Sequence, residues 1–361
     1  MTKNSTETIR WKQAAGLDLG DSHSFLYVLD RASGERLEET RLRTTAAALR
    51  QRFEGVAPMR IAIEVGTHSP WVSRLLEKLG HEVIVANSHK LRMIYGNRRK
   101  NDRVDAEYLA RLARVDPKLL HPLLHRGEQT QADLAVLRSR DALVKVRTQL
   151  VLRIRGTVKS LGHRLPKCSP DGFGPRLIAE LPEALQPALA PLLETIGQVN
   201  AQIKAFDRQL KELTRKYPHS ELLLQVRGVG PVTALAFLLT LEDPERFAKS
   251  RSVGAYLGLV PASDESGESK PELRITKEGD AFLRRLLVQC AHYILGPFGE
   301  DCDLRRYGER IAQGGGKYAK KRAAVAVARK LAVLLHRLWS TAEVYDPLYN
   351  AQRAERSRKA A

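Results

Sequence analysis

The first third of the chain alternates short apolar runs with polar turns. Apolar, β-prone runs at 14–19 and 24–29 flank the turn Gly20-Asp21-Ser22, a pattern that predicts a β-hairpin. Residues 35–43 are a candidate third strand. The pattern then predicts helix 45–53, strand 60–65, helix 70–79, strand 82–86 and helix 104–114. Paired strands followed by this alternation predict an α/β domain.

From about residue 128 the pattern becomes helical. Segments rich in Leu, Val and Arg continue to about residue 162, and a Pro- and Gly-rich break follows at 166–175. Beyond the break, apolar residues recur at alternating spacings of three and four, as in a heptad repeat: Leu189, Leu192, Ile196, Val199, Ile203, Phe206, Leu210 and Leu213. This seam fits a helical hairpin, an intersubunit coiled coil, or a core-facing helix within one subunit. We interpret 126–217 as a helical, coiled-coil-like linker region.

The last part of the chain predicts a mainly helical domain over 218–345 and a basic tail over 346–361. Within that domain, residues 317–338 join a basic start to an apolar-rich helix. The segment fits either a packed helix with one solvated basic end or a direct contact with nucleic acid.

The charge of the chain indicates its partners. Among 361 residues, 60 Lys and Arg against 41 Asp and Glu give a formal net charge of +19, which favours nucleic acid as a partner. A membrane surface would attract the same charge, but no run approaches the roughly 18 apolar residues of a membrane span. The three cysteines lack the short paired spacing of a zinc site or a disulfide framework. We therefore expect a soluble protein of a reducing cytoplasm, without membrane contact.

Four acidic residues occupy positions that suit a metal site. Asp18 lies in the first strand, Glu64 ends a later buried strand, and Asp102 and Asp105 begin a helix on one face. Acids so placed are typical of a ribonuclease-H/RuvC-like domain, which we expect over 12–122. Carboxylates bind Mg²⁺, and bound metal ions can stabilise the attacking and leaving oxygens of a phosphoryl displacement. For Asp102 and Asp105, helix capping is the alternative.

Two further segments suit contacts with a phosphate backbone. Arg98, Arg99 and Lys100 would hold phosphates near the metal, or would simply lie in a solvated loop. Residues 222–234 look like a helix-hairpin-helix, in which a turn containing Gly228 and Gly230 exposes backbone N–H groups to a DNA phosphate. An ordinary tight helix connection would carry the same glycines.

A polar loop in the last domain offers a nucleophile. Ser266 stands beside Gly267, with Arg274, Lys277 and Arg284 downstream. A serine hydroxyl in this setting could attack a phosphate if its proton were removed and the developing charge stabilised. Serines in polar loops are more often solvated turn residues.

These segments, in this order, resemble the transposases of insertion-sequence family 110, including its 1111 branch, over nearly the whole chain. The family's DEDD segments are matched at 16–18, 63–66 and 100–106. Its serine-containing segment is matched at 258–261, 266–267 and 275–279. The resemblance implies that Asp18, Glu64, Asp102 and Asp105 are metal ligands and that Ser266 is the nucleophile.

A protein of this kind would excise and insert a mobile DNA element. The resemblance implies that a structured noncoding bridge RNA pairs with donor and target DNA, while Ser266 attacks a DNA phosphate and Mg²⁺ at the four acids stabilises the charge. It also implies a homo-oligomer, a dimer assembling into a tetramer, for which the heptad seam offers contacts. The expected location is a prokaryotic cytoplasm, at the nucleoid when the protein is bound to DNA.

Two other functions fit parts of the pattern. A metal-dependent structure-selective nuclease, similar to a Holliday-junction resolvase, needs the acids and the basic surface but no serine. A nonenzymatic nucleic-acid-binding scaffold needs only the hairpin and the long helices. Cleavage that depends on Ser266 would exclude the nuclease, and any Mg²⁺-dependent chemistry would exclude the scaffold.

Overall fold

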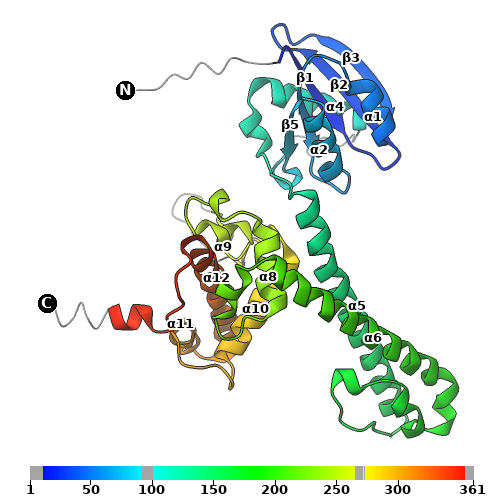
Figure 1. The fold of residues 1–361 in the computed structure, drawn as a ribbon, viewed down its shortest axis with the longest axis vertical. Coiled ribbons are helices and arrows are strands. Elements are labelled where there is room, and N and C mark those ends of the chain that lie inside the picture. Colours follow the sequence, from blue (N-terminus) through cyan, green and yellow to red (C-terminus); the bar gives the residue numbers. More distant parts are fainter. Residues whose placement is uncertain (1–10, 92–100, 265–270, 272, 354–361) are drawn as a thin grey trace. The chain divides into compact units, whose positions relative to one another are not determined.

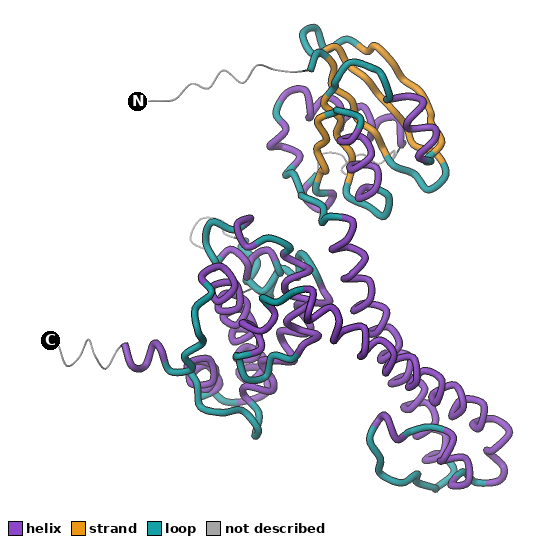
Figure 2. The backbone as a smooth tube through the Cα atoms, viewed as in Figure 1, coloured by secondary structure: helices purple, strands orange, loops and turns teal. Residues whose placement is uncertain are grey.

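The computed structural model describes residues 11–91, 101–264, 271 and 273–353, and it divides the chain into two compact units, with the division after Arg126. The strands of the described ranges all lie in the first unit (Figure 1), and the second unit is helical (Figure 2). Arg98, Arg99, Lys100 and Ser266 lie outside the described residues. The finer division at 126–217, 218–345 and 346–361 stays a prediction.

The first unit is built on a mixed five-stranded sheet in the order β3-β2-β1-β4-β5. The antiparallel part consists of β1 (Gln13–Asp18), β2 (His23–Asp30) and β3 (Arg36–Arg43). On its other side, β1 pairs parallel with β4 (Arg60–Glu64), and β4 pairs parallel with β5 (Glu82–Ala86). The mixed sheet agrees with the predicted ribonuclease-H-like domain.

Helices cover both faces of the sheet, which explains why the central strands are apolar at nearly every position. On one face, alternate residues of β1 and β4 pack against α1 (Ala46–Phe53) and α2 (Ser69–Lys78). On the other face lies α4 (Asp102–Val115). This helix can approach closely because β1 carries Gly16, where a Cβ atom would lie 2.0 Å from the carbonyl oxygen of Ala106.

The second unit begins with two long helices, α5 (Glu128–Ser160) and α6 (Gln186–Lys216), which pair as a helical hairpin. Short 3₁₀ helices in the connection pack with both helices around an apolar cluster that includes Phe173. The buried strip of α6 differs in part from the expected seam. Leu193 and Asn200 are buried, whereas Leu192 and Val199 are only half-buried.

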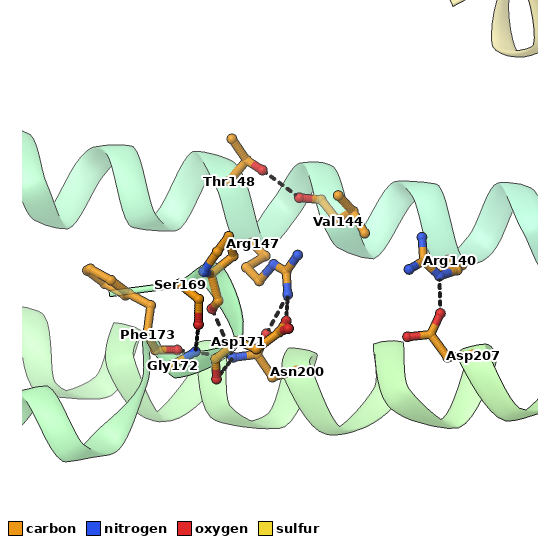
Figure 3. A network of polar contacts seen from close by, with 11 residues as sticks. Arg140, Val144, Arg147, Thr148, Ser169, Asp171, Gly172, Phe173, Asn200 and Asp207 are labelled. Atoms are coloured by element: carbon orange, nitrogen blue, oxygen red, sulfur yellow. Dashed lines mark hydrogen bonds and ion pairs between the residues drawn. The ribbon is translucent and has the colours of Figure 1, made fainter. Parts of the chain in front are cut away.

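Polar contacts between the two helices explain this shift (Figure 3). Arg147 of α5 donates to Asn200 Oδ1 at 2.9 Å and to Asp171 Oδ1 at 2.7 Å. Arg140 donates to Asp207 Oδ1 at 2.6 Å. Asn200 Nδ2 donates in turn to a backbone carbonyl of the connecting segment at 3.0 Å. The strip therefore packs within one chain, and the expected intersubunit contact of the seam stays a prediction.

The rest of the second unit is a helical domain: α7 (Ser220–Leu224), α8 (Pro231–Leu241), α9 (Ser252–Tyr256), α10 (Ala281–Leu295), α11 (Asp303–Ala312) and α12 (Gly316–Thr341). Helix α8 is buried at every position from Thr233 to Leu241, as expected for a helix that is apolar on all sides. Within the described ranges, no helix is long and apolar enough to cross a membrane.

Candidate active site

Asp18 and Glu64 end neighbouring parallel strands. Leu17 of β1 is aligned with Ile63 of β4, and in each strand the acid is the next residue. Both acids are half-buried. Because parallel strands present their carboxyl ends at the same edge of a sheet, the two side chains share that edge.

Helix α4 runs antiparallel to these two strands. Its last turn is tied to the opposite edge of the sheet, where Arg60, the first residue of β4, donates from Nη1 to the carbonyl oxygen of Ala113 at 3.3 Å. Arg114 donates from Nε to the carbonyl oxygen of Arg31, just after β2, at 2.9 Å. The first turn of α4 therefore lies toward the edge where β1 and β4 end.

The two acids in that first turn differ in environment. Asp105 is buried, with only 7% of its surface exposed, whereas Asp102 is exposed. Neither is the N-cap, because Asn101 takes that place and its side chain accepts a hydrogen bond from the backbone N–H of Arg103 at 3.1 Å. Burial of a carboxylate is costly unless hydrogen bonds or a cation compensate it.

Three separate elements therefore present acids toward the same edge of the sheet. Among the residues that the structure describes, no three Asp, Glu, His or Cys side chains form a group arranged to hold a metal ion. The donors themselves suit a hard divalent cation, since Mg²⁺ takes carboxylate oxygens. The chemistry of the acids fits such a metal, and their role as ligands stays a prediction.

His68 is a residue at this edge that the sequence patterns did not single out. It stands just before α2, in the connection that follows Glu64. Trp71 Nε1 donates to His68 Nδ1 at 3.1 Å, and His68 Nε2 lies 3.3 Å from Asp21 Oδ1 in the turn after β1. Because an indole N–H can only donate, the ring proton of a neutral His68 belongs on Nε2. The sequence did offer one signal for this contact, since a His and a Trp three residues apart at the start of a helix lie on the same face.

In the second unit, the segment that contains Ser266 joins the domain through a short β stem. Pro261 and Ile275 form an isolated antiparallel bridge. Two backbone hydrogen bonds of 2.9 Å, between 262 and 274 and between 276 and 260, close the ladder. The stem therefore joins residues 260–262 to residues 274–276, on either side of position 266 in the sequence.

Arg284 of α10 supports this stem by binding the chain just before and just after it. Its Nη1 donates to the carbonyl oxygens of Leu257 and Glu278, each at 2.9 Å. Burial lowers the pKa of the guanidinium, and the nearby Asp280 opposes that shift. Arg274 and Lys277 are exposed, so of the three predicted phosphate contacts they have the more accessible side chains.

Gly228 and Gly230 lie in the turn between α7 and α8, which gives the helix–turn–helix outline expected for 222–234. Gly228 has a φ of 94°, and a Cβ atom there would lie 2.8 Å from Tyr293 Cδ1. Gly230 is the N-cap of α8, and a Cβ atom there would meet open space. The first N–H groups of α8 are a suitable place for a phosphate.

A mixed sheet with acids at its carboxyl edge, in a strongly basic chain, is typical of enzymes that cut or join nucleic acid strands. Comparison with known families agrees with this class. A model described as "Transposase IS116/IS110/IS902 family" matches residues 220–298, and a DEDD model of IS110 transposases, described as "Transposase", matches residues 15–162.

Individual relatives match over most of their length. The protein y4pF/y4sB of Sinorhizobium fredii is 34% identical over 301 residues, which cover 81% of this chain and 76% of the relative. The transposase for insertion sequence element IS1328 of Yersinia enterocolitica is 30% identical over 76% of this chain and 82% of its own. The transposase for IS1111A of Coxiella burnetii is 28% identical over 70% of each chain.

The chain belongs to the IS116/IS110/IS902 family of transposases. The resemblance drawn from the sequence is thereby confirmed, as is the prediction of a DNA transposase. The identity of the catalytic residues is a separate question.

Proposed function

We propose that this transposase excises and inserts its element by covalent attachment of Ser266 to a DNA phosphate, assisted by Mg²⁺ on Asp18, Glu64, Asp102 and Asp105. The observation that supports this proposal most directly is the antiparallel course of α4 across β1 and β4. That course brings the buried Asp105 toward the edge where two other acids end their strands.

The protein's own residues have distinct parts in this proposal. Neighbouring strands present Asp18 and Glu64, and Asp105 is held by a helix whose far end is fixed to the sheet. When bound there, a divalent metal would stabilise negative charge on the attacking and leaving oxygens of the displacement. The hydroxyl of Ser266 loses its proton as its oxygen bonds to phosphorus, the bond from phosphorus to the deoxyribose oxygen breaks, and that leaving oxygen takes up a proton.

We also propose that a bridge RNA supplies sequence recognition and that the enzyme acts as a dimer that assembles into a tetramer. The net charge of +19 supports binding of both DNA and RNA, because backbone phosphates are recognised without reading the bases. When base pairing selects the target, the protein needs few contacts to base edges.

Covalent adduct mapping tests the serine. Cells that carry the complete element with its flanking DNA would express wild type, Ser266→Ala or the matched control Ser263→Ala, and nuclease-resistant adducts would be located by peptide mass. We expect an adduct on Ser266 in wild type and in the control, and none in Ser266→Ala. Cleavage that survives in Ser266→Ala without an adduct would instead establish a metal-dependent nuclease.

The turn before α8 is best tested at Gly230. The positive φ of Gly228 and its contact with Tyr293 mean that a side chain at that position would disturb the fold as well as the surface. Gly230→Glu places a negative charge in open space at the helix N-terminus. We expect about tenfold weaker DNA binding with an unchanged melting temperature, and an unchanged salt-dependent affinity would contradict the phosphate contact.

A further inference from the structure

A large groove runs through the helical domain of the second unit. Its volume is about 1560 Å³, beyond the roughly 300–1,000 Å³ of small-molecule pockets. One wall is α12 from Lys321 to Arg337, a length of about 24 Å at 1.5 Å per residue. The other walls are α11, the stem of the segment that contains Ser266, and residues 343–350. These dimensions suit a polymer better than a metabolite.

The floor and the rim of this groove differ in chemistry. Half-buried apolar residues form the floor, among them Tyr307 and Ile311 of α11 and Val325 and Leu334 of α12. Eight of the lining residues are Lys or Arg and three are Asp or Glu. An apolar surface bordered by cations matches a ligand with flat, weakly polar groups on a negatively charged backbone.

The acidic residues of the groove are engaged in contacts with the chain itself. Asp303 accepts hydrogen bonds from the backbone N–H groups of Asn350 at 2.6 Å and Ala351 at 3.3 Å. Glu343 pairs with Arg337 at 2.8 Å. These bonds hold the segment after α12 in place, and the lining carries more cations than acids. Lys330 Nζ lies 4.1 Å from the centre of the Tyr307 ring, so rim and floor are in contact.

We propose that this groove binds single-stranded DNA, with the bases on the apolar floor and the phosphates along the basic rim. A duplex hides its base faces and would leave the floor uncovered, whereas unpaired bases stack on aromatic and apolar side chains. About 24 Å of α12 corresponds to roughly seven nucleotides at 3.4 Å each. One wall is the stem that flanks Ser266. If Ser266 is the nucleophile, as in the proposed function, the bound strand is the unpaired DNA that adjoins the cleaved phosphate.

Equilibrium binding to the purified full-length chain tests the groove. The probes are a fluorescent 12-residue oligothymidine, the same length of oligouridine, and a 12-base-pair duplex. Lys321→Gln/Lys330→Gln removes two cations from the rim. The matched control, Lys317→Gln/Lys320→Gln, removes two exposed cations from the same helix outside the groove.

We expect the rim variant to bind oligothymidine at least tenfold more weakly, with the slope of log affinity against log salt reduced by about 1.4, or about 0.7 for each lost phosphate contact. The control pair should change affinity by less than about threefold, as for charges outside the site. Tyr307→Leu keeps the floor apolar, and we expect about fivefold weaker binding of oligothymidine with unchanged binding of the duplex.

Several outcomes would overturn the proposal. If the rim variant and the control variant lose the same affinity for oligothymidine, the effect comes from the net charge of the protein and not from the groove. Stronger binding of oligouridine would assign the groove to RNA, and a monomer-to-dimer shift lost only in the rim variant would assign it to a second copy of the chain. Each measurement is repeated on Ser266→Ala, so that binding is judged apart from catalysis. If no adduct forms on Ser266 while binding of oligothymidine still depends on the rim, the groove is a DNA-binding site and the serine mechanism is wrong.

Discussion

The acidic edge of the first unit and the serine-bearing segment of the second are supported by different kinds of structure. Two hydrogen-bonded strands and a 14-residue helix present the acids. By contrast, a short ladder around Pro261 and Ile275, with Arg284 behind it, supports the serine segment. Metal ligands must keep fixed relative positions, so they suit a rigid sheet. The proposed nucleophile must meet a large substrate, and a fixed stem on either side of its segment suits that role.

The largest expected effect comes from neutralising one acid of the rigid edge. Asp105→Asn preserves shape but removes the charge of the buried carboxylate, and we expect adduct formation to fall by roughly 100-fold or more because the metal loses a ligand. The melting temperature should stay close to that of wild type, since the amide has the shape of the carboxylate. Adduct yield measures the loss of activity, and Mg²⁺ titration calorimetry measures the loss of metal affinity.

Glu107→Gln is the matched control on the same helix. Glu107 forms an i,i+4 pair with Arg111 at 2.6 Å, and such exposed pairs contribute little. Its adduct yield should stay within about twofold of wild type. Equal Mg²⁺ affinity in Asp105→Asn and wild type would remove Asp105 from the metal site.

A second test moves the helix and leaves the acids unchanged. In Gly16→Ala, the new Cβ would lie 2.0 Å from the carbonyl oxygen of Ala106, so α4 must shift. We expect a loss of about 3 kcal/mol in the free energy of unfolding and a strong loss of activity. Gly66→Ala is the control, because a Cβ there meets no atom within 4 Å although the residue lies two positions after Glu64. Similar stabilities for the two variants would show that close packing of α4 does not position the site.

The sheet was predictable because its signals are local. Each predicted strand and helix between residues 12 and 122 forms within two residues of its expected bounds. Apolar strands, polar turns and helix starts specify this part of the fold without reference to distant contacts. Asp18 and Glu64 could be placed at one edge because both end parallel strands.

The helical unit was less predictable because side chains far apart in sequence decide its packing. An apolar pattern alone selects Leu192 and Val199 for the seam of α6. The structure buries Leu193 and Asn200 instead, since Asn200 is the partner of Arg147 on the other helix of the hairpin. Burial of a polar residue through contact with an arginine far away in the sequence cannot be predicted from the pattern of apolar residues. The same reason explains Arg284, whose partners are two backbone carbonyls that no sequence pattern reveals.

The smallest expected effect is at the stem of the serine segment. Arg284→Met keeps an apolar side chain of similar length but leaves the carbonyl oxygens of Leu257 and Glu278 without this donor. We expect a loss of about 2 kcal/mol in the free energy of unfolding, with about tenfold lower adduct yield, because a 1 Å misplacement of a reacting group is already costly. Mg²⁺ affinity should not change, since the acids belong to the other unit.

Arg285→Met is the control for this test. Arg285 is the next residue of α10 and forms an ion pair of 2.6 Å with Asp141 on α5. Its loss therefore lowers stability without affecting the stem. If both variants lose adduct yield in proportion to their stability, Arg284 acts only on the fold. If adduct yield falls further in Arg284→Met at equal stability, the arginine positions the stem. The difference between the two regions then extends to function, because the acids depend on a sheet and the serine depends on one side chain that holds the stem.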